Sequence, residues 1–173
     1  MHRRNGRIFL QLWHTGRVSH PHFQNGETPI APSAVAADGD AYTPSGKTPY
    51  VTPRAMTQQD IDATVEEYAR ATELSKEAGF DGVEIHAANG YLIDQFIRDG
   101  SNQRTDAYGG SVENRLRFLL QVTDAVVGAW SADRVGVRLS PTNAFNSMSD
   151  SNPPRTCPKD VPFLWTLWRV GNA

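Results

Sequence analysis

Residues 83–91 have the sequence Val-Glu-Ile-His-Ala-Ala-Asn-Gly-Tyr, which predicts a short buried strand that runs into a polar loop. Successive side chains of a strand point to opposite faces, so Val83 and Ile85 share one face while His86 lies on the other. α/β proteins place their functional sites where a strand ends in such a loop. The candidate site residues of this stretch are His86, Asn89 and Tyr91.

These three side chains suit a substrate that carries an oxygen. His86 and Asn89 can both donate hydrogen bonds, and Tyr91 carries a phenolic proton. A histidine at a strand end is, by itself, more often a structural residue, so the interpretation depends on the three residues together. Two hydrogen-bond donors and an acid on one loop indicate carbonyl chemistry.

Length and composition are those of one soluble globular domain. The chain has 173 residues, of which 39% are hydrophobic and 21% charged, and its net charge of −2 favours neither nucleic acid nor an anionic membrane surface as a partner. No apolar run is long enough for a spanning helix, and the basic N-terminus lacks an apolar signal core. The single cysteine, Cys157, excludes an internal disulfide. We therefore expect a cytoplasmic protein.

Three histidines, His14, His20 and His22, stand close together in the sequence. Zinc sites combine histidines with cysteines or carboxylates at short, defined spacings. No such residue joins these histidines at that spacing, so we expect no metal site.

Strand and helix signals alternate along most of the chain. A first long helix is predicted between the cap residue Thr57 and the stop at Gly79, and a second between Ser111 and Trp130, with a short helical segment at residues 92–97. Apolar runs predict strands at residues 7–13, 80–86 and 135–140. Strands that alternate with helices predict parallel βαβ units.

Two stretches lack this alternation. Residues 14–56 are rich in proline and glycine, which predicts a long loop or a set of short turns and hairpins. Residues 150–173 combine prolines with a short apolar run, where Trp165 and Trp168 are expected to be exposed or loosely packed. We expect residues 1–149 to form the folded domain and residues 150–173 to be a divergent C-terminal tail.

The two faces of the strands distinguish a barrel from a doubly wound sheet. Each predicted strand has one aliphatic face, which we expect to pack on helices, and its other face carries a polar residue near the C-terminal end: Gln11, His86 and Arg138. A doubly wound sheet is covered by helices on both faces and is apolar on both. A TIM barrel instead gathers polar groups at the C-terminal ends of its strands. The predicted fold class is therefore α/β, as part of a TIM (β/α)8 barrel.

Four motifs follow one another along the chain: QLWHTGR at residues 11–17, AGFDGVEIHAANGY at 78–91, SNQRTDAYGGSVENR at 101–115 and RLSP at 138–141. Together they resemble the Old Yellow Enzyme family of NADH:flavin oxidoreductases, which includes N-ethylmaleimide reductases and 12-oxophytodienoate reductases. The resemblance implies a barrel that holds FMN at its mouth and uses NAD(P)H as reductant, so residues 1–149 would be a partial FMN-binding (β/α) barrel domain. It also implies an ene-reductase, which transfers hydride to the activated C=C bond of an α,β-unsaturated carbonyl or nitro compound.

The resemblance implies roles on the substrate side of the site. His86 and Asn89 would bind the substrate oxygen and polarise the double bond. Tyr91 would protonate the α-carbon as a general acid. Trp13 would form a wall of the substrate pocket.

On the cofactor side, the resemblance implies that Gln11 bonds the pyrimidine edge of the flavin. Arg138 would lie near flavin N1 and the C2 carbonyl, where its positive charge favours the anionic reduced flavin. The third motif is expected to be mostly structural, organising a loop and the entry to a helix through Arg104, Asp106, Asn114 and Arg115.

The chain is shorter than a complete barrel of this family. A (β/α)8 barrel needs about 200 residues or more, and only strand–helix units that match the third to fifth units can be placed. Three parallel strands cannot close, so both sheet edges would be unpaired and open to self-association. The missing units would also supply the anchor of the FMN phosphate, so we expect the isolated chain to bind FMN weakly or not at all and to turn over poorly.

Two alternatives to the ene-reductase interpretation remain open. The first is a non-catalytic truncated fragment or assembly partner that has lost FMN binding, which the missing barrel units would favour. The second is another flavin-dependent barrel, such as a relative of dihydroorotate dehydrogenase. The His-x-x-Asn-x-Tyr spacing at residues 86–91 argues against this second alternative.

Overall fold

A three-stranded parallel sheet forms the centre of the structure, a computed structural model that describes residues 1–156. Its strands are β1 (Phe9–Leu12), β6 (Gly82–Ala87) and β7 (Val135–Leu139), in the order β1-β6-β7. The three predicted strands are confirmed, with ends that differ by a residue or two. The strands of this sheet lie side by side in their order along the chain, as the strands of consecutive barrel units do. Within the described residues the sheet does not close into a barrel. The prediction of a partial α/β barrel is confirmed.

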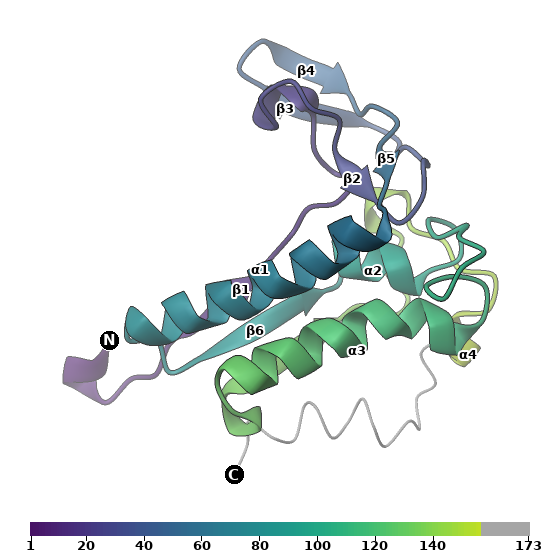
Figure 1. Ribbon diagram of the computed structural model, residues 1–173. Coiled ribbons are helices and arrows are strands. Elements are labelled where there is room, and N and C mark those ends of the chain that lie inside the picture. The colour runs from purple at the N-terminus through teal and green to yellow at the C-terminus, as the bar shows by residue number, and fades with distance from the viewer. Residues whose placement is uncertain (157–173) are drawn as a thin grey trace.

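The two long helices lie side by side over one face of this sheet (Figure 1). They are α1 (Gln58–Glu77) and α3 (Val112–Ala129), and the short helix α2 (Leu92–Ile97) follows β6. All three were predicted. Among residues 1–156, no helix combines the length and apolarity needed to cross a membrane.

The hydrophobic core lies between the sheet and these helices. The β6 residues on the helix side, Val83, Ile85 and Ala87, are fully buried. On β1 the outcome differs from the prediction of an aliphatic face packed on helices, because Leu12 is buried while Leu10 is 36% exposed. As an edge strand, β1 receives less helical cover than the central strand β6. The opposite face of the sheet is open.

Residues 14–56 contain turns and one hairpin, in line with the prediction, and also a short parallel pair of strands that was not predicted. β2 (Ile30–Ala31) pairs in parallel with β5 (Arg54–Ala55), and β3 (Asp40–Thr43) pairs with β4 (Gly46–Pro49) in an antiparallel hairpin. The hairpin stands away from the helices (Figure 1). Single turns complete the described residues at η1 (His2–Arg4), η2 (Pro21–Phe23), η3 (Ala132–Arg134), η4 (Phe145–Ser147) and α4 (Pro153–Thr156).

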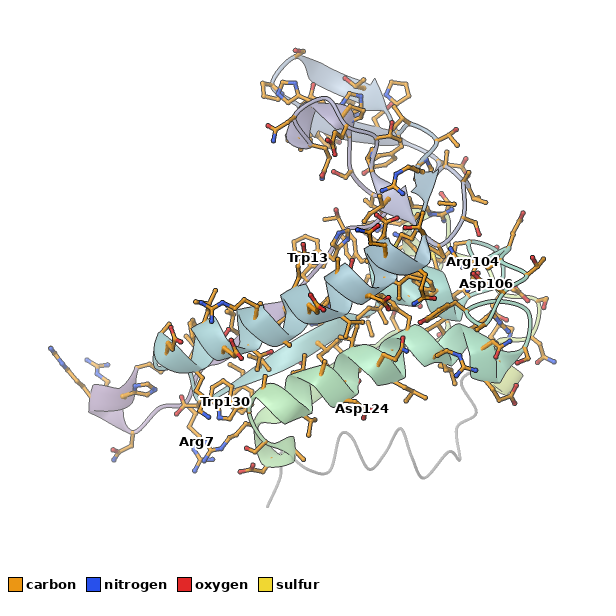
Figure 2. All side chains as sticks on the ribbon, viewed as in Figure 1. Arg7, Trp13, Arg104, Asp106, Asp124 and Trp130 are labelled. Carbon is orange, nitrogen blue, oxygen red and sulfur yellow. The ribbon has the colours of Figure 1, made fainter. Side chains whose placement is uncertain are left out.

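The loop between α2 and α3 is held by the residues predicted for that role. Arg104 forms an ion pair with Asp106 and donates hydrogen bonds to the backbone oxygens of Pro32 and Met56 (Figure 2). Asn114 and Arg115 act at the start of α3, where they donate to the backbone oxygens of Gly109 and Ile97. The structural interpretation of the third motif is confirmed.

The C-terminal stretch is described only in part. Arg115 forms an ion pair with Asp150 and donates to the hydroxyl of Thr156, so residues 150–156 contact the start of α3. The expectations for Trp165 and Trp168 lie outside the described residues. The division into residues 1–149 and 150–173 stays a prediction.

Both ends of α1 follow the sequence signals. The Thr57 hydroxyl accepts a hydrogen bond from the backbone N–H of Asp60, whose carboxylate accepts one from the N–H of Thr57, and the pair forms a capping box. At the other end Gly79 has a φ of +85°, and Phe80 donates to the backbone oxygen of Ser75. A left-handed residue after a helix favours glycine, because it has no Cβ to clash.

We predict that Thr57→Ala lowers the free energy of unfolding by about 1 kcal/mol, because the N–H of Asp60 loses its acceptor. Urea unfolding followed by helical circular dichroism measures this change. Glu67→Ala, at an exposed position on the same helix, is the control and should change stability by less than about 0.5 kcal/mol. An equal loss in both variants would contradict the role of the cap.

Candidate functional site

The open face of the sheet carries the predicted polar side chains in two rows. Gln11 lies opposite Glu84 in the strand register, and His86 lies opposite Arg138. The Nε2 of Gln11 donates to Oε1 of Glu84 at 2.5 Å. Arg138 is exposed, and within residues 1–156 its guanidinium makes no hydrogen bond or ion pair. Gln11, His86 and Arg138 thus share one face of the sheet, as the strand alternation predicted.

Three aromatic rings form a cluster at the C-terminal end of the strands, which we call the ring cluster: Trp13, His86 and Tyr91. The ring of Trp13 meets that of Tyr91 edge-on, with 4.7 Å between centroids, and lies 6.0 Å from the ring of His86. His86 and Tyr91 are 5.4 Å apart. Figure 2 shows Trp13 projecting from the end of β1 away from α3 and toward the hairpin. Trp13 stays 54% exposed, so one side of the cluster is open.

His86 is held neutral by its surroundings. Its side chain is buried, and its Nδ1 atom has no hydrogen-bond partner within the described residues. Burial lowers the pKa of His86, the positive charge of Arg138 lowers it further, and Glu84 opposes both effects. A neutral imidazole has one N–H donor and one acceptor nitrogen, so His86 can donate to an oxygen at neutral pH.

The backbone after β6 is sharply turned and tightly packed. Asn89 and Gly90 have φ angles of +57° and +76°. A Cβ at residue 90 would lie 2.7 Å from Cγ of Met148 and 2.8 Å from the backbone oxygen of Phe145. Only glycine fits there, because the segment that follows β7 packs directly on this turn.

Two buried side chains that sequence analysis missed hold the turn in place. The amide of Gln95 donates to the backbone oxygens of Gly90 and Thr15 and accepts from the N–H of Arg17. The guanidinium of Arg17 donates in turn to four backbone oxygens, those of Val35, Ala36, Asn146 and Ser147. Apart from the bond between Gln95 and Gly90, these contacts join segments far apart in the chain, so no local sequence signal could reveal them.

Glu84 and Tyr50 were also missed as neighbours of the site. Glu84 stands two residues before His86, so the strand period already placed both side chains on one face. Burial raises the pKa of Tyr50, and the nearby Tyr91 adds to the rise. Tyr50 and Thr15 also line a cavity of about 380 Å³ beside the hairpin. The position of Tyr50 depends on the fold of residues 14–56, for which the sequence shows no periodicity.

The three histidines near the N-terminal end have local roles. Nδ1 of His14 accepts from the N–H of Gly16, and Nδ1 of His20 accepts from the N–H of His22. Over residues 1–156, no three His, Cys, Asp or Glu side chains gather to hold a metal ion.

Comparison of the chain with protein families and solved structures identifies its relatives. The model of the NADH:flavin oxidoreductase / NADH oxidase family matches residues 1–156. The chain belongs to this family. The resemblance to Old Yellow Enzymes is confirmed, since an Old Yellow Enzyme homologue from Zymomonas mobilis superimposes with a TM-score of 0.86 at 46% identity, covering 90% of this chain and 43% of that one.

Two further relatives show what the family contains. A probable flavin mononucleotide-dependent alkene reductase of Leishmania infantum is 50% identical over 88% of this chain and 44% of its own length. A structure of morphinone reductase in complex with tetrahydroNAD has a TM-score of 0.85 and 46% identity, and covers 90% of this chain and 45% of that one. The chain spans less than half the length of each of these relatives.

We predict that His86 titrates below the ordinary histidine value of about 6.5. Arg138→Ala should raise the pKa of His86 because a nearby cation is lost, and Glu84→Gln should lower it because a carboxylate is lost. NMR titration of the imidazole carbon–proton signals measures all three values. Shifts of the same sign in the two variants would contradict this electrostatic account.

A pH dependence of stability follows from the same lowered pKa. Between the folded pKa of His86 and the unfolded value of about 6.5, the unfolded chain binds more protons. The free energy of unfolding should therefore fall as the pH drops below about 6.5. The pKa of His14 is also lowered by burial and contributes in the same direction. Urea unfolding at a series of pH values measures the slope, and His86→Gln should reduce it.

Proposed function

We propose that the protein acts as an FMN-dependent NAD(P)H oxidoreductase of the ene-reductase type. Its substrate would be an α,β-unsaturated carbonyl or nitro compound. The observation that carries the proposal is the ring cluster, which brings a neutral histidine within 5.4 Å of a tyrosine, ring to ring, on the open face of a parallel sheet. The names of the alkene reductase and of the tetrahydroNAD complex support it.

The residues on the open face fit a flavin. Among the described residues, 1–156, no carboxylate forms an ion pair with Arg138, so its charge suits the negative charge of a reduced flavin. Gln11 is exposed in the neighbouring row, where its amide oxygen is available to an N–H of the flavin edge while its nitrogen is bonded to Glu84. Both residues would hold FMN, and the bound cofactor would supply hydride-transfer chemistry.

The substrate would be held and polarised by two donors. The neutral ring of His86 donates one N–H, and the amide of Asn89 donates a second. Such preorganised donors stabilise the negative charge that develops on a carbonyl oxygen during reduction. Tyr91 would deliver the proton to the α-carbon, and the indole of Trp13, which meets the ring of Tyr91 edge-on, would form a wall of the substrate pocket.

Further strands would complete the sheet. Within the described residues, β1 and β7 each pair with β6 alone, so each has one edge of unpaired backbone groups. Such edges bind other strands, and self-association is one way to satisfy them. Size-exclusion chromatography would reveal it as a species larger than one chain.

A cytoplasmic location completes the proposal. Its support is compositional: the chain has one cysteine and an ordinary balance of charge. Fluorescence microscopy of the tagged protein in its own cells would test it, and a signal confined to another compartment would overturn it.

We predict that Tyr91→Phe lowers kcat about 100-fold with cyclohexenone and NADPH, because the proton donor is lost. Steady-state rates of the FMN-loaded full chain measure the effect, and quenching of flavin fluorescence measures FMN affinity, which should not change. Tyr42→Phe, on the exposed hairpin, is the matched control and should leave kcat unchanged.

The outcomes of this experiment separate the leading proposal from its alternative. Failure of the wild-type chain to bind FMN and turn over would favour a non-catalytic fragment or assembly partner. Equal rates for Tyr91→Phe and wild type would keep the enzyme but remove Tyr91 as the acid.

A further inference from the structure

Three atoms of Asn89 form hydrogen bonds with the segment that follows β7. Its N–H donates to the hydroxyl of Ser140 at 2.7 Å, and its backbone oxygen accepts from the amide of Asn146 at 2.8 Å. The third contact involves the side chain, whose Oδ1 accepts from Nδ2 of Asn143 at 2.8 Å. The remaining polar group, the NH₂ of Asn89, makes no hydrogen bond among residues 1–156.

The direction of the contact between the two side-chain amides is determined by a backbone group. The N–H of Phe145 points to Oδ1 of Asn143 at 2.9 Å. A backbone N–H can only donate, so the Asn143 atom that it meets must be the oxygen. The NH₂ of Asn143 then faces Asn89, and Asn89 must present its oxygen in return. Its own NH₂ is thereby turned away from Asn143.

We propose that Asn143 is a positioning residue that orients the amide of Asn89 so that its NH₂ group faces the substrate oxygen. This inference rests on the proposed function, in which that oxygen is bound by His86 and Asn89. Without Asn143, the amide of Asn89 could rotate and present its own oxygen, which would repel a carbonyl oxygen. A donor that is oriented before the substrate arrives needs no reorganisation during the reaction.

The other two contacts on Asn89 cannot perform this task. Ser140 and Asn146 bond its backbone, so they fix the left-handed turn at a φ of +57° and leave the amide torsion free. Asn143 is the described residue that bonds the side-chain amide itself.

The orientation can be tested by NMR on the full chain labelled with ¹⁵N-asparagine, without cofactor or turnover. In the wild type, the NH₂ of Asn143 should exchange slowly with water and that of Asn89 rapidly; the Asn89 signal is identified by its absence in Asn89→Asp. In Asn143→Asp, the new carboxylate can only accept, so the NH₂ of Asn89 should turn toward it. Its exchange should then slow about fivefold, the factor that corresponds to a hydrogen bond of typical net strength.

Two NMR results would overturn the proposal: slow exchange of the Asn89 NH₂ in the wild type, or no slowing in a folded Asn143→Asp. If Asn143→Asp does not fold, the wild-type measurement alone decides. Asn143→Ala should leave the Asn89 NH₂ in rapid exchange, because no acceptor remains.

Kinetics of the FMN-loaded chain provide a second readout. We expect kcat/KM for cyclohexenone to fall about fivefold in Asn143→Ala, where the amide rotates freely, and about 50-fold in Asn143→Asp, where the donor is turned away. Thr142→Ala, at the exposed neighbouring position, is the matched control and should have no effect. FMN affinity should be equal in all variants.

The two readouts distinguish this inference from the proposed function. Equal losses of kcat/KM in Asn143→Ala and Asn143→Asp would indicate a merely structural role and overturn the positioning proposal. Absence of turnover in the wild type would overturn the proposed function, while the exchange measurement would still decide how the Asn89 amide is oriented.

Discussion

The structure depends on the pairing of the central strand β6 with a parallel strand on each side. This pairing sets the register that brings Gln11 beside Glu84 and His86 beside Arg138. Because strand side chains alternate, the same register buries Val83 and Ile85 under α1 and α3. A slip of one residue would turn the polar row into the core and expose the aliphatic row, so the core and the site share one constraint.

Contacts between loops hold the candidate site in place at the C-terminal ends of the strands. The turn at Gly90 is closed by direct contact with the segment after β7, and Gln95 and Arg17 bond the backbone around it. Buried polar groups of this kind need partners, and here the partners are mostly backbone oxygens. These contacts hold the turn that carries Asn89, whose NH₂ makes no hydrogen bond within residues 1–156.

Much of the fold could be predicted because its signals are local. Thr57, Asp60 and Gly79 determine where α1 begins and ends, and the period of residues 83–86 determines which face is polar. The ring cluster was predicted in part, since His86 and Tyr91 belong to one stretch. The burial of β1 was overestimated, because the sequence of a strand does not say whether it lies at an edge, as the exposed Leu10 shows.

By itself, the sequence determined the three strands of the central sheet, the long helices and the polar face, since each depends on residues close together in the chain, and its four motifs determined the family. Only the tertiary structure decided that Trp13 meets Tyr91, that Arg17 reaches Asn146, and that Asn143 orients Asn89. The physical reason is the range of the interactions. Helix caps and strand periods act over a few residues, whereas these contacts join chain segments up to 129 residues apart. Only the packing of the folded chain brings such segments into contact.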